Sequence, residues 1–129
     1  ALGISIRDLL SPSGEERTLI RQEEQQLYEY DEYKLQIRRL DFGKKRGIYE
    51  FSTYDPETKD TPPSWGLHPY AEVGVVLEGK MEVNLDGTVY LLGPGDSIYI
   101  KPNLYHTMRN AGDTPCRSFW HLQIMDDSV

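Results

Sequence analysis

Three side chains that commonly bind metals occur in two short segments: His68 and Glu72 stand four residues apart, and His106 follows later in the chain. Two imidazoles and one carboxylate form a ligand set for a divalent metal that leaves coordination positions open. Iron, manganese, nickel, copper and zinc all accept this set, so the residue types leave the metal undetermined. The alternative is that the three are ordinary buried polar residues, each satisfied by hydrogen bonds.

The three side chains can meet only if β-strands carry them to one face. Alternate residues of a strand share a face, so His106 lies with Leu104 and Met108 on an apolar, inward side. Glu72 belongs to a second apolar strand and is expected at the mouth of the interior. His68 has the same parity as Glu72 if that strand extends back toward it. We therefore expect one metal site formed by His68, Glu72 and His106.

The rest of the chain alternates in the manner of short strands separated by turns. Asp86-Gly87 is typical of a tight hairpin, and the segment 93–96 (Gly-Pro-Gly-Asp) predicts a second turn. Many short strands of this kind predict an all-β antiparallel sandwich or barrel. The expected strands are 33–37, 48–51, 73–77, 81–85, 88–92, 97–100, 104–109 and 118–124.

Size and composition limit the classes of protein to which this chain can belong. The 129 residues are enough for one domain, and 14 basic against 21 acidic residues give a net charge of −7, which makes the chain itself a poor binder of nucleic acid. The single cysteine, Cys116, excludes an internal disulfide framework and is expected to pack as a small apolar residue in a reducing, cytoplasmic setting. No apolar run reaches the length of a membrane span, so no membrane partner is expected.

Four further residues are candidates for contact with a small ligand. Trp65, Tyr70 and Tyr105 stand next to the metal-binding segments and supply aromatic walls or phenolic donors. His121, the third histidine, shares parity with Phe119 and could line the same interior from another strand. For each of the four, simple packing is the competing interpretation.

The two segments resemble the two motifs of the cupin superfamily. His68, Glu72 and Gly79 match the later part of the first motif, and the second motif is matched by Gly87, Gly95-Asp96, Pro102, His106 and Asn110. The resemblance implies a double-stranded β-helix, the cupin or jelly-roll barrel, over residues 13–129. Gly66 occupies the place of the first motif histidine, which reduces the usual three-histidine, one-glutamate site to His68, Glu72 and His106.

The first ten residues resemble the closing helix of an Xre-type helix-turn-helix domain. Ser5 can cap a short helix with Ile6, Leu9 and Leu10 on its apolar side, so residues 1–12 are interpreted as a short helical remnant, the tail of a preceding domain or a linker. This layout implies a transcriptional regulator in which the cupin domain senses a small-molecule effector. Such a regulator would be a homodimer and would contact a palindromic operator only through the preceding DNA-binding domain.

Two other functions compete with the regulator. Cupins with a similar order of ligands include mononuclear non-haem iron oxygenases and epoxidases, for which two histidines and a carboxylate leave positions for substrate and dioxygen. The third possibility is a binding module that carries no metal. Bound redox-active iron with substrate-dependent oxygen uptake would indicate the enzyme, and elemental analysis would separate the third possibility from the other two.

Overall fold

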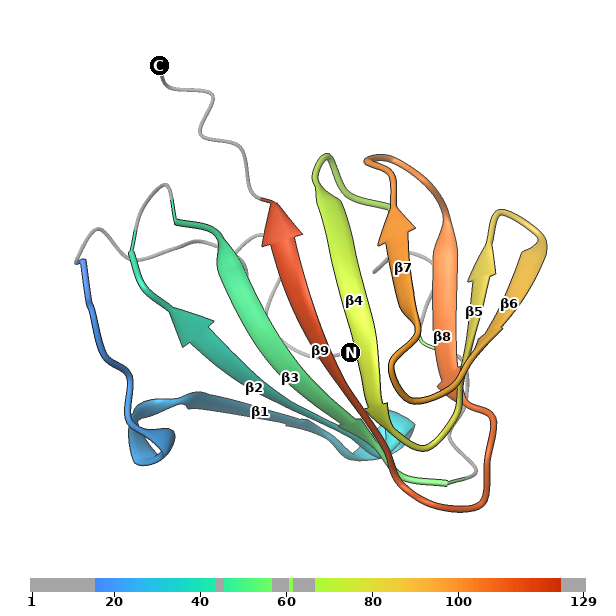
Figure 1. The fold of residues 1–129 in the computed structure, drawn as a ribbon, viewed down its shortest axis with the longest axis horizontal. Helices are drawn as coiled ribbons and strands as arrows, with labels where there is room; N and C mark the ends of the chain where they lie inside the picture. The colour runs from blue at the N-terminus through green and yellow to red at the C-terminus, as the bar shows by residue number, and fades with distance from the viewer. Residues whose placement is uncertain (1–15, 44–45, 57–60, 62–66, 124–129) are drawn as a thin grey trace.

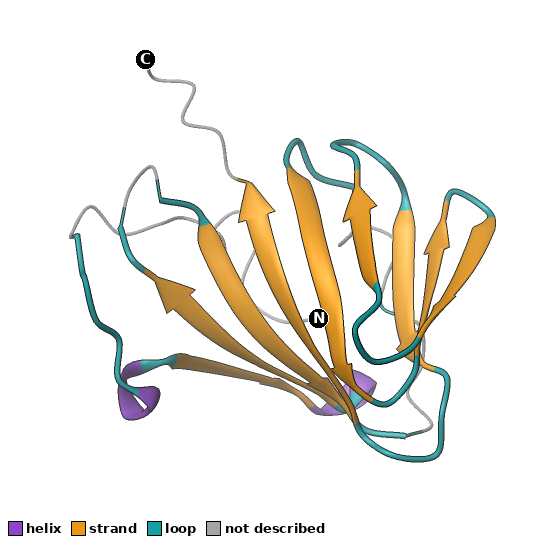
Figure 2. Cartoon of the chain, in the orientation of Figure 1, coloured by secondary structure: helices purple, strands orange, loops and turns teal. Residues whose placement is uncertain are grey.

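The computed structural model describes residues 16–43, 46–56, 61 and 67–123. Figure 2 shows that strands form nearly all of the regular structure of this part of the chain. No helix in the described ranges is long and apolar enough to cross a membrane. The elements, in chain order, are η1 (Gln22–Glu24), β1 (Gln26–Tyr30), η2 (Asp31–Tyr33), β2 (Leu35–Asp41), β3 (Ile48–Tyr54), β4 (Ala71–Glu78), β5 (Met81–Leu85), β6 (Thr88–Leu92), β7 (Ser97–Ile100), β8 (His106–Asn110) and β9 (Cys116–Gln123).

The strands form two antiparallel sheets. The larger sheet has the order β1-β2-β3-β9-β4-β7, and the smaller has the order β6-β5-β8. Figure 1 shows the strands of the larger sheet fanning out beside the smaller sheet, with β9, the last strand, between β3 and β4. This arrangement confirms the expected all-β jelly-roll class. The helical remnant expected in residues 1–12 lies outside the described residues.

Local sequence explains the two predicted turns and one position where the predicted strand is wrong. Asp86 and Gly87 have φ values of 48° and 96°, the left-handed pair that a tight hairpin between β5 and β6 requires. The segment 93–96 also turns, with Gly95 at φ 88° and the backbone N–H of Asp96 donating to the carbonyl oxygen of Gly93. Tyr33, expected in a strand, instead ends η2, because Lys34 adopts φ 48° and the chain turns there from β1 into β2.

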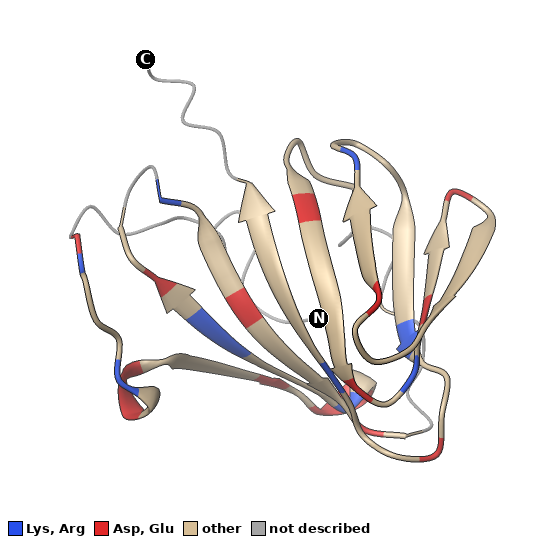
Figure 3. Ribbon diagram, in the orientation of Figure 1, with Lys and Arg blue, Asp and Glu red and all other residues tan. Residues whose placement is uncertain are grey.

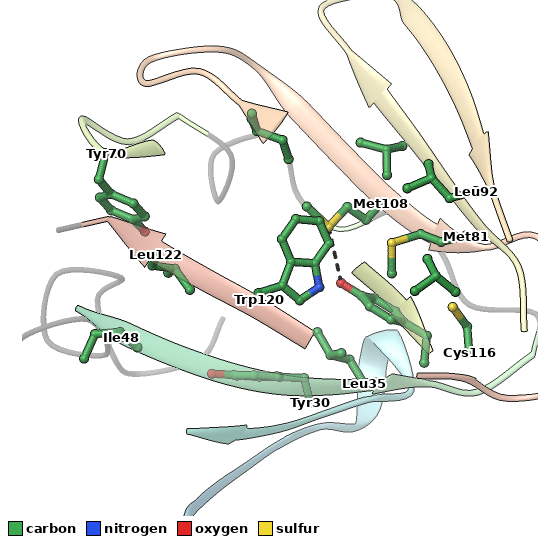
Figure 4. Close-up of a cluster of buried hydrophobic side chains, with 14 residues drawn as sticks. Tyr30, Leu35, Ile48, Tyr70, Met81, Leu92, Met108, Cys116, Trp120 and Leu122 are labelled. Carbon is green, nitrogen blue, oxygen red and sulfur yellow. Dashed lines mark hydrogen bonds between the residues drawn. The ribbon is translucent and has the colours of Figure 1, made fainter. Parts of the chain in front are cut away.

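Alternate residues of the strands fill the space between the sheets. Ile48, Met81 and Ile100 are fully buried, and each contributes about 1.5–3 kcal/mol relative to an exposed side chain. Figure 4 shows Met81, Leu92 and Met108 of the smaller sheet facing Trp120 and Leu122 of the larger one. Cys116 is likewise fully buried and packs in the apolar core, as predicted. The same inward faces also bury the charged residues Arg39, Glu50 and Glu72, together with His68 and His106.

Candidate metal centre

Local contacts hold the side chain of His68 just before β4. Its Nδ1 lies 2.9 Å from the carbonyl oxygen of Tyr70, and its ring stacks on the Tyr70 ring with centroids 3.8 Å apart. The backbone N–H of Asn103 donates to the carbonyl oxygen of His68 at 2.7 Å. The residue is only 3% exposed, so the ring has one orientation relative to the strand that follows.

Glu72 and His106 reach the same point from different sheets. Glu72 is on the inward face of β4, and His106 is the first residue of β8, where Leu85 of β5 is its cross-strand partner. One carboxylate oxygen of Glu72, Oε2, lies 3.1 Å from Nε2 of His68 and 3.0 Å from Nε2 of His106. The ligand atoms offered by the three residues all lie within 4.8 Å of one another.

Hydrogen bonds at the far side of each ring determine what the two Nε2 atoms can do. Nδ1 of His106 lies 2.9 Å from the carbonyl oxygen of Leu104, so both histidines have Nδ1 beside a backbone acceptor and must carry a hydrogen there. Each Nε2 therefore presents either a second proton or a lone pair toward Glu72. Backbone carbonyls commonly orient metal-binding histidines in this way. The two Nε2 atoms and the Glu72 carboxylate therefore point to one place with the tautomers that a divalent cation needs. A bound cation would take the place of the Nε2 protons.

The electrostatics of the site follow from burial and from the short contacts. Burial alone would raise the pKa of Glu72, but its hydrogen bonds with His106 and His68 lower that pKa to about 2. Burial alone would lower the pKa of His106, but its hydrogen bond with Glu72 and the charge of that carboxylate raise the pKa above the ordinary value. The carboxylate is therefore ionised at neutral pH, as a metal ligand must be.

The other predicted binding residues are not all close to this point. Tyr70 is buried against His68. Tyr105 is 52% exposed, so about half of its surface faces solvent and not the interior. The ring of His121 stacks on Tyr49 of β3 with centroids 4.6 Å apart, on the outer face of the larger sheet, because Trp120 and Leu122 take the inward positions of β9. Trp65, like Gly66, lies outside the described residues.

Sequence reasoning missed two charged residues on the inward face of the larger sheet. Arg39 of β2 and Glu50 of β3 are directly opposite each other in the strand register and are 3% and 7% exposed. The alternation of Ile48, Glu50 and Ser52 carried a signal for Glu50, since all three face inward. Figure 3 shows charged residues within β2, β3 and β4 as well as in the loops.

The fold and this site define a class of protein: a double-sheeted β-barrel domain with a His-Glu-His cluster inside it. A match to the cupin domain family covers residues 50–122, more than half of the chain, and the chain belongs to that family. The matched region contains Glu50, His68, Glu72 and His106.

Individual relatives show how widely this domain is used. Polyketide synthase CurC of Streptomyces cyaneus is 41% identical over 56 residues, which cover 43% of this chain and 36% of CurC. The matched parts span less than half of the length of the curated relatives. An RmlC-like cupin from Shewanella frigidimarina superposes with a TM-score of 0.66 at 20% identity, over 90% of this chain and 99% of that one. The cupin domain of an XRE family transcriptional regulator from Enterobacter cloacae gives a TM-score of 0.62 at 17% identity, over 72% and 99% of the chains. Identities this low show a shared fold.

Proposed function

We propose that this chain is the small-molecule-sensing cupin domain of a transcriptional regulator, and that its sensor site contains a divalent metal held by His68, Glu72 and His106. The observation that carries the metal site is the approach of two imidazole Nε2 atoms to one oxygen of Glu72, at 3.1 and 3.0 Å. A bound metal would supply a Lewis acid for oxygen atoms of the ligand. The carbonyl groups of Tyr70 and Leu104 hold the two imidazoles in the orientation that this role needs.

Two likenesses support the regulator. The fold is shared with a cupin domain of an XRE family regulator. Residues 1–10 resemble the closing helix of an Xre-type DNA-binding domain, although they lie outside the described residues. In this proposal the protein is a cytoplasmic homodimer, and DNA is contacted only by the helix-turn-helix domain. The effector then acts by binding one arrangement of the two DNA readers more tightly than the other.

The test uses the protein together with its DNA-binding domain. Operator sequences are selected from random DNA, and affinity is then measured with zinc, with a chelator, and with libraries of small polar molecules. The proposal expects selected operators and at least one compound whose effect on DNA affinity is lost in His106→Ala. If no DNA is selected under any of these conditions, the regulator assignment is wrong, whereas the metal site is judged separately by the metal content of the chain.

A metal-dependent enzyme, such as an oxygenase, is the second candidate. It is favoured by the three ligand atoms that the cluster offers within the described residues, since three protein ligands leave open positions on a metal for substrate and a second reactant. The likeness to a polyketide synthase component is compatible with it. Oxygen consumption by the iron-loaded chain, dependent on an added organic substrate and absent from His106→Ala, would favour the enzyme over the sensor.

A further inference from the structure

Glu50 is a buried carboxyl group with an unused acceptor. It projects from the inward face of β3 and is 7% exposed, yet its Oε2 has no hydrogen-bond partner among the described residues. A buried polar atom without a partner costs about 1–3 kcal/mol, and charged atoms cost more. Such an atom in a native fold calls for an explanation, and the explanations include backbone or side-chain strain, a functional role, and a bound water, ion or ligand.

The side chains around Glu50 do not supply the missing donor. Trp120 is its cross-strand neighbour on β9, but the indole N–H donates to Oγ of Ser118 at 2.8 Å. The indole itself lies over Gly74 of β4, where an added Cβ would come within 2.4 Å of it. On the other side of Glu50, Arg39 has its Nη2 3.8 Å from Oδ2 of Asp41.

Glu50 faces the same interior as the metal centre. Burial, and then the charge of Glu72, raise its pKa to about 7, while the charge of Arg39 acts in the opposite direction. Tyr70, which stacks on His68, also has a raised pKa, mainly through burial and then through the charges of Glu72 and Glu50. The strands of Glu50 and Glu72 are separated only by β9, so their backbones are about 10 Å apart. Glu50 and Glu72 are therefore buried on the same face of the larger sheet, two strands apart.

We propose that Glu50 is a ligand-recognition residue, and that the ligand is a small polyhydroxylated molecule. Two of its oxygens would face the metal centre of His68, Glu72 and His106, and a hydroxyl farther along the molecule would donate to Oε2 of Glu50. This inference rests on the proposed function for the metal centre. It adds the chemical class of the ligand and a second contact point, on β3, that the metal-binding residues do not provide.

The experiment compares two probes that differ only in hydroxyl groups. Threonate and 2-hydroxybutanoate share the same 2-hydroxycarboxylate end for the metal, but only threonate has further hydroxyls. Each is titrated calorimetrically into the zinc-loaded chain at about pH 8, above the pKa of Glu50, where its carboxyl group is mostly ionised. We expect threonate to bind about tenfold or more tightly than 2-hydroxybutanoate, the ratio that one hydrogen bond to a charged acceptor provides.

Substitutions at Glu50 then locate the source of that preference. Glu50→Met keeps the length of the side chain without an acceptor and is expected to bring the ratio of the two affinities close to one. Glu50→Gln, which keeps one oxygen, is expected to give an intermediate ratio of affinities. It replaces the Met variant in the test if that variant folds poorly. Glu29→Gln, at an exposed position of β1, is the matched control.

The outcomes separate this inference from the metal site. If wild type shows no preference, binds neither probe, or keeps its preference in Glu50→Met, Glu50 does not recognise a hydroxyl and the inference is overturned. Zinc content is measured first in wild type and in His106→Ala. If wild type does not hold zinc, the proposed function fails, and the same pair of probes is titrated into the metal-free chain, where an effect of Glu50→Met still supports the inference and its absence overturns it.

Discussion

Tyr70 contacts His68 in two ways at once: its ring stacks on the imidazole at 3.8 Å with an interplanar angle of 5°, and its carbonyl oxygen accepts from Nδ1 at 2.9 Å. A residue two positions away in the chain thus fixes both the plane and the tautomer of a metal-binding candidate. Contacts of this kind orient metal-binding histidines and tune their basicity, although they contribute no ligand atom.

Removal of the Tyr70 ring is therefore expected to weaken metal binding. Tyr70→Ala should lower zinc affinity by about 10- to 100-fold, the usual effect of losing an outer contact of a metal-binding histidine. Tyr70→Phe keeps both the stacked ring and the backbone carbonyl and should bind zinc like wild type. Competition with a chelating dye measures both variants. If the Phe variant loses as much affinity as the Ala variant, the phenolic hydroxyl and not the stacking is what matters.

The three histidines offer an internal control for the metal centre. His106→Ala removes one of the ligand atoms that converge on Glu72, so the chain should lose bound zinc, cobalt or iron after dialysis. His121→Ala should keep the wild-type metal content, because His121 stacks on Tyr49 on the outer face of the sheet. Elemental analysis of the two variants side by side decides the matter. Equal losses would mean that the metal is bound somewhere other than the His68-Glu72-His106 cluster.

Metal affinity should depend on pH through His106. Its pKa is raised, by its hydrogen bond with Glu72 against the opposite effect of burial, so it keeps a proton to higher pH than an ordinary histidine. A metal has to displace that proton, so zinc affinity should fall about tenfold per pH unit below the raised pKa. Competition titrations between about pH 5.5 and pH 8 measure the profile. In Glu72→Gln the fall should begin at a lower pH, and an unchanged midpoint would contradict this explanation.

Glu50 should make the metal-free fold less stable as the pH rises. Its pKa is about 7 in the folded chain against an ordinary value of 4.5, so between these values the folded state binds the additional proton. The free energy of unfolding therefore decreases with rising pH across this range, and the cost of ionising Glu50 is complete only above about pH 7. Glu50→Gln removes this cost and should gain roughly 2–3 kcal/mol over wild type between about pH 5 and about pH 8. Urea unfolding in the presence of a chelator tests whether the stability difference between Glu50→Gln and wild type grows as the pH rises. Glu29→Gln, at an exposed position, is the control.

The residues of the candidate site differ in how far the sequence predicts them. His106 was predictable because it alternates with Leu104 and Met108, and the hairpin at Asp86-Gly87 because its turn needs left-handed backbone. Apart from β1, the succession of strands follows from the same local signals, whereas the jelly-roll class follows from the resemblance of the two motifs to those of cupins. These depend on neighbours in the chain, which a sequence displays directly.

What could not be predicted depends on pairing between distant strands. Glu50 alternates with apolar residues, but a carboxylate in a strand is ordinarily expected to face solvent. Its position opposite Arg39 is set by the register of β2 and β3, which the sequence does not display. The face of β9 was also ambiguous, since both alternating sets contain aromatic residues, and packing of Trp120 over Gly74 places His121 outside.

That packing gives a prediction for Gly74. A Cβ at this position would come within 2.4 Å of the Trp120 indole, while the backbone conformation itself is open to other residues. Gly74→Ala should therefore lower the free energy of unfolding by about 1–3 kcal/mol, the usual cost of overpacking a core. Gly93→Ala, where the nearest atom is the Asp96 carboxylate at 3.8 Å, is the matched control and should change stability little. Because the indole would have to move from its place over β4 toward Glu50, tryptophan fluorescence should change in Gly74→Ala and not in the control. A Gly74→Ala variant with wild-type stability and emission would mean that the indole does not lie over Gly74.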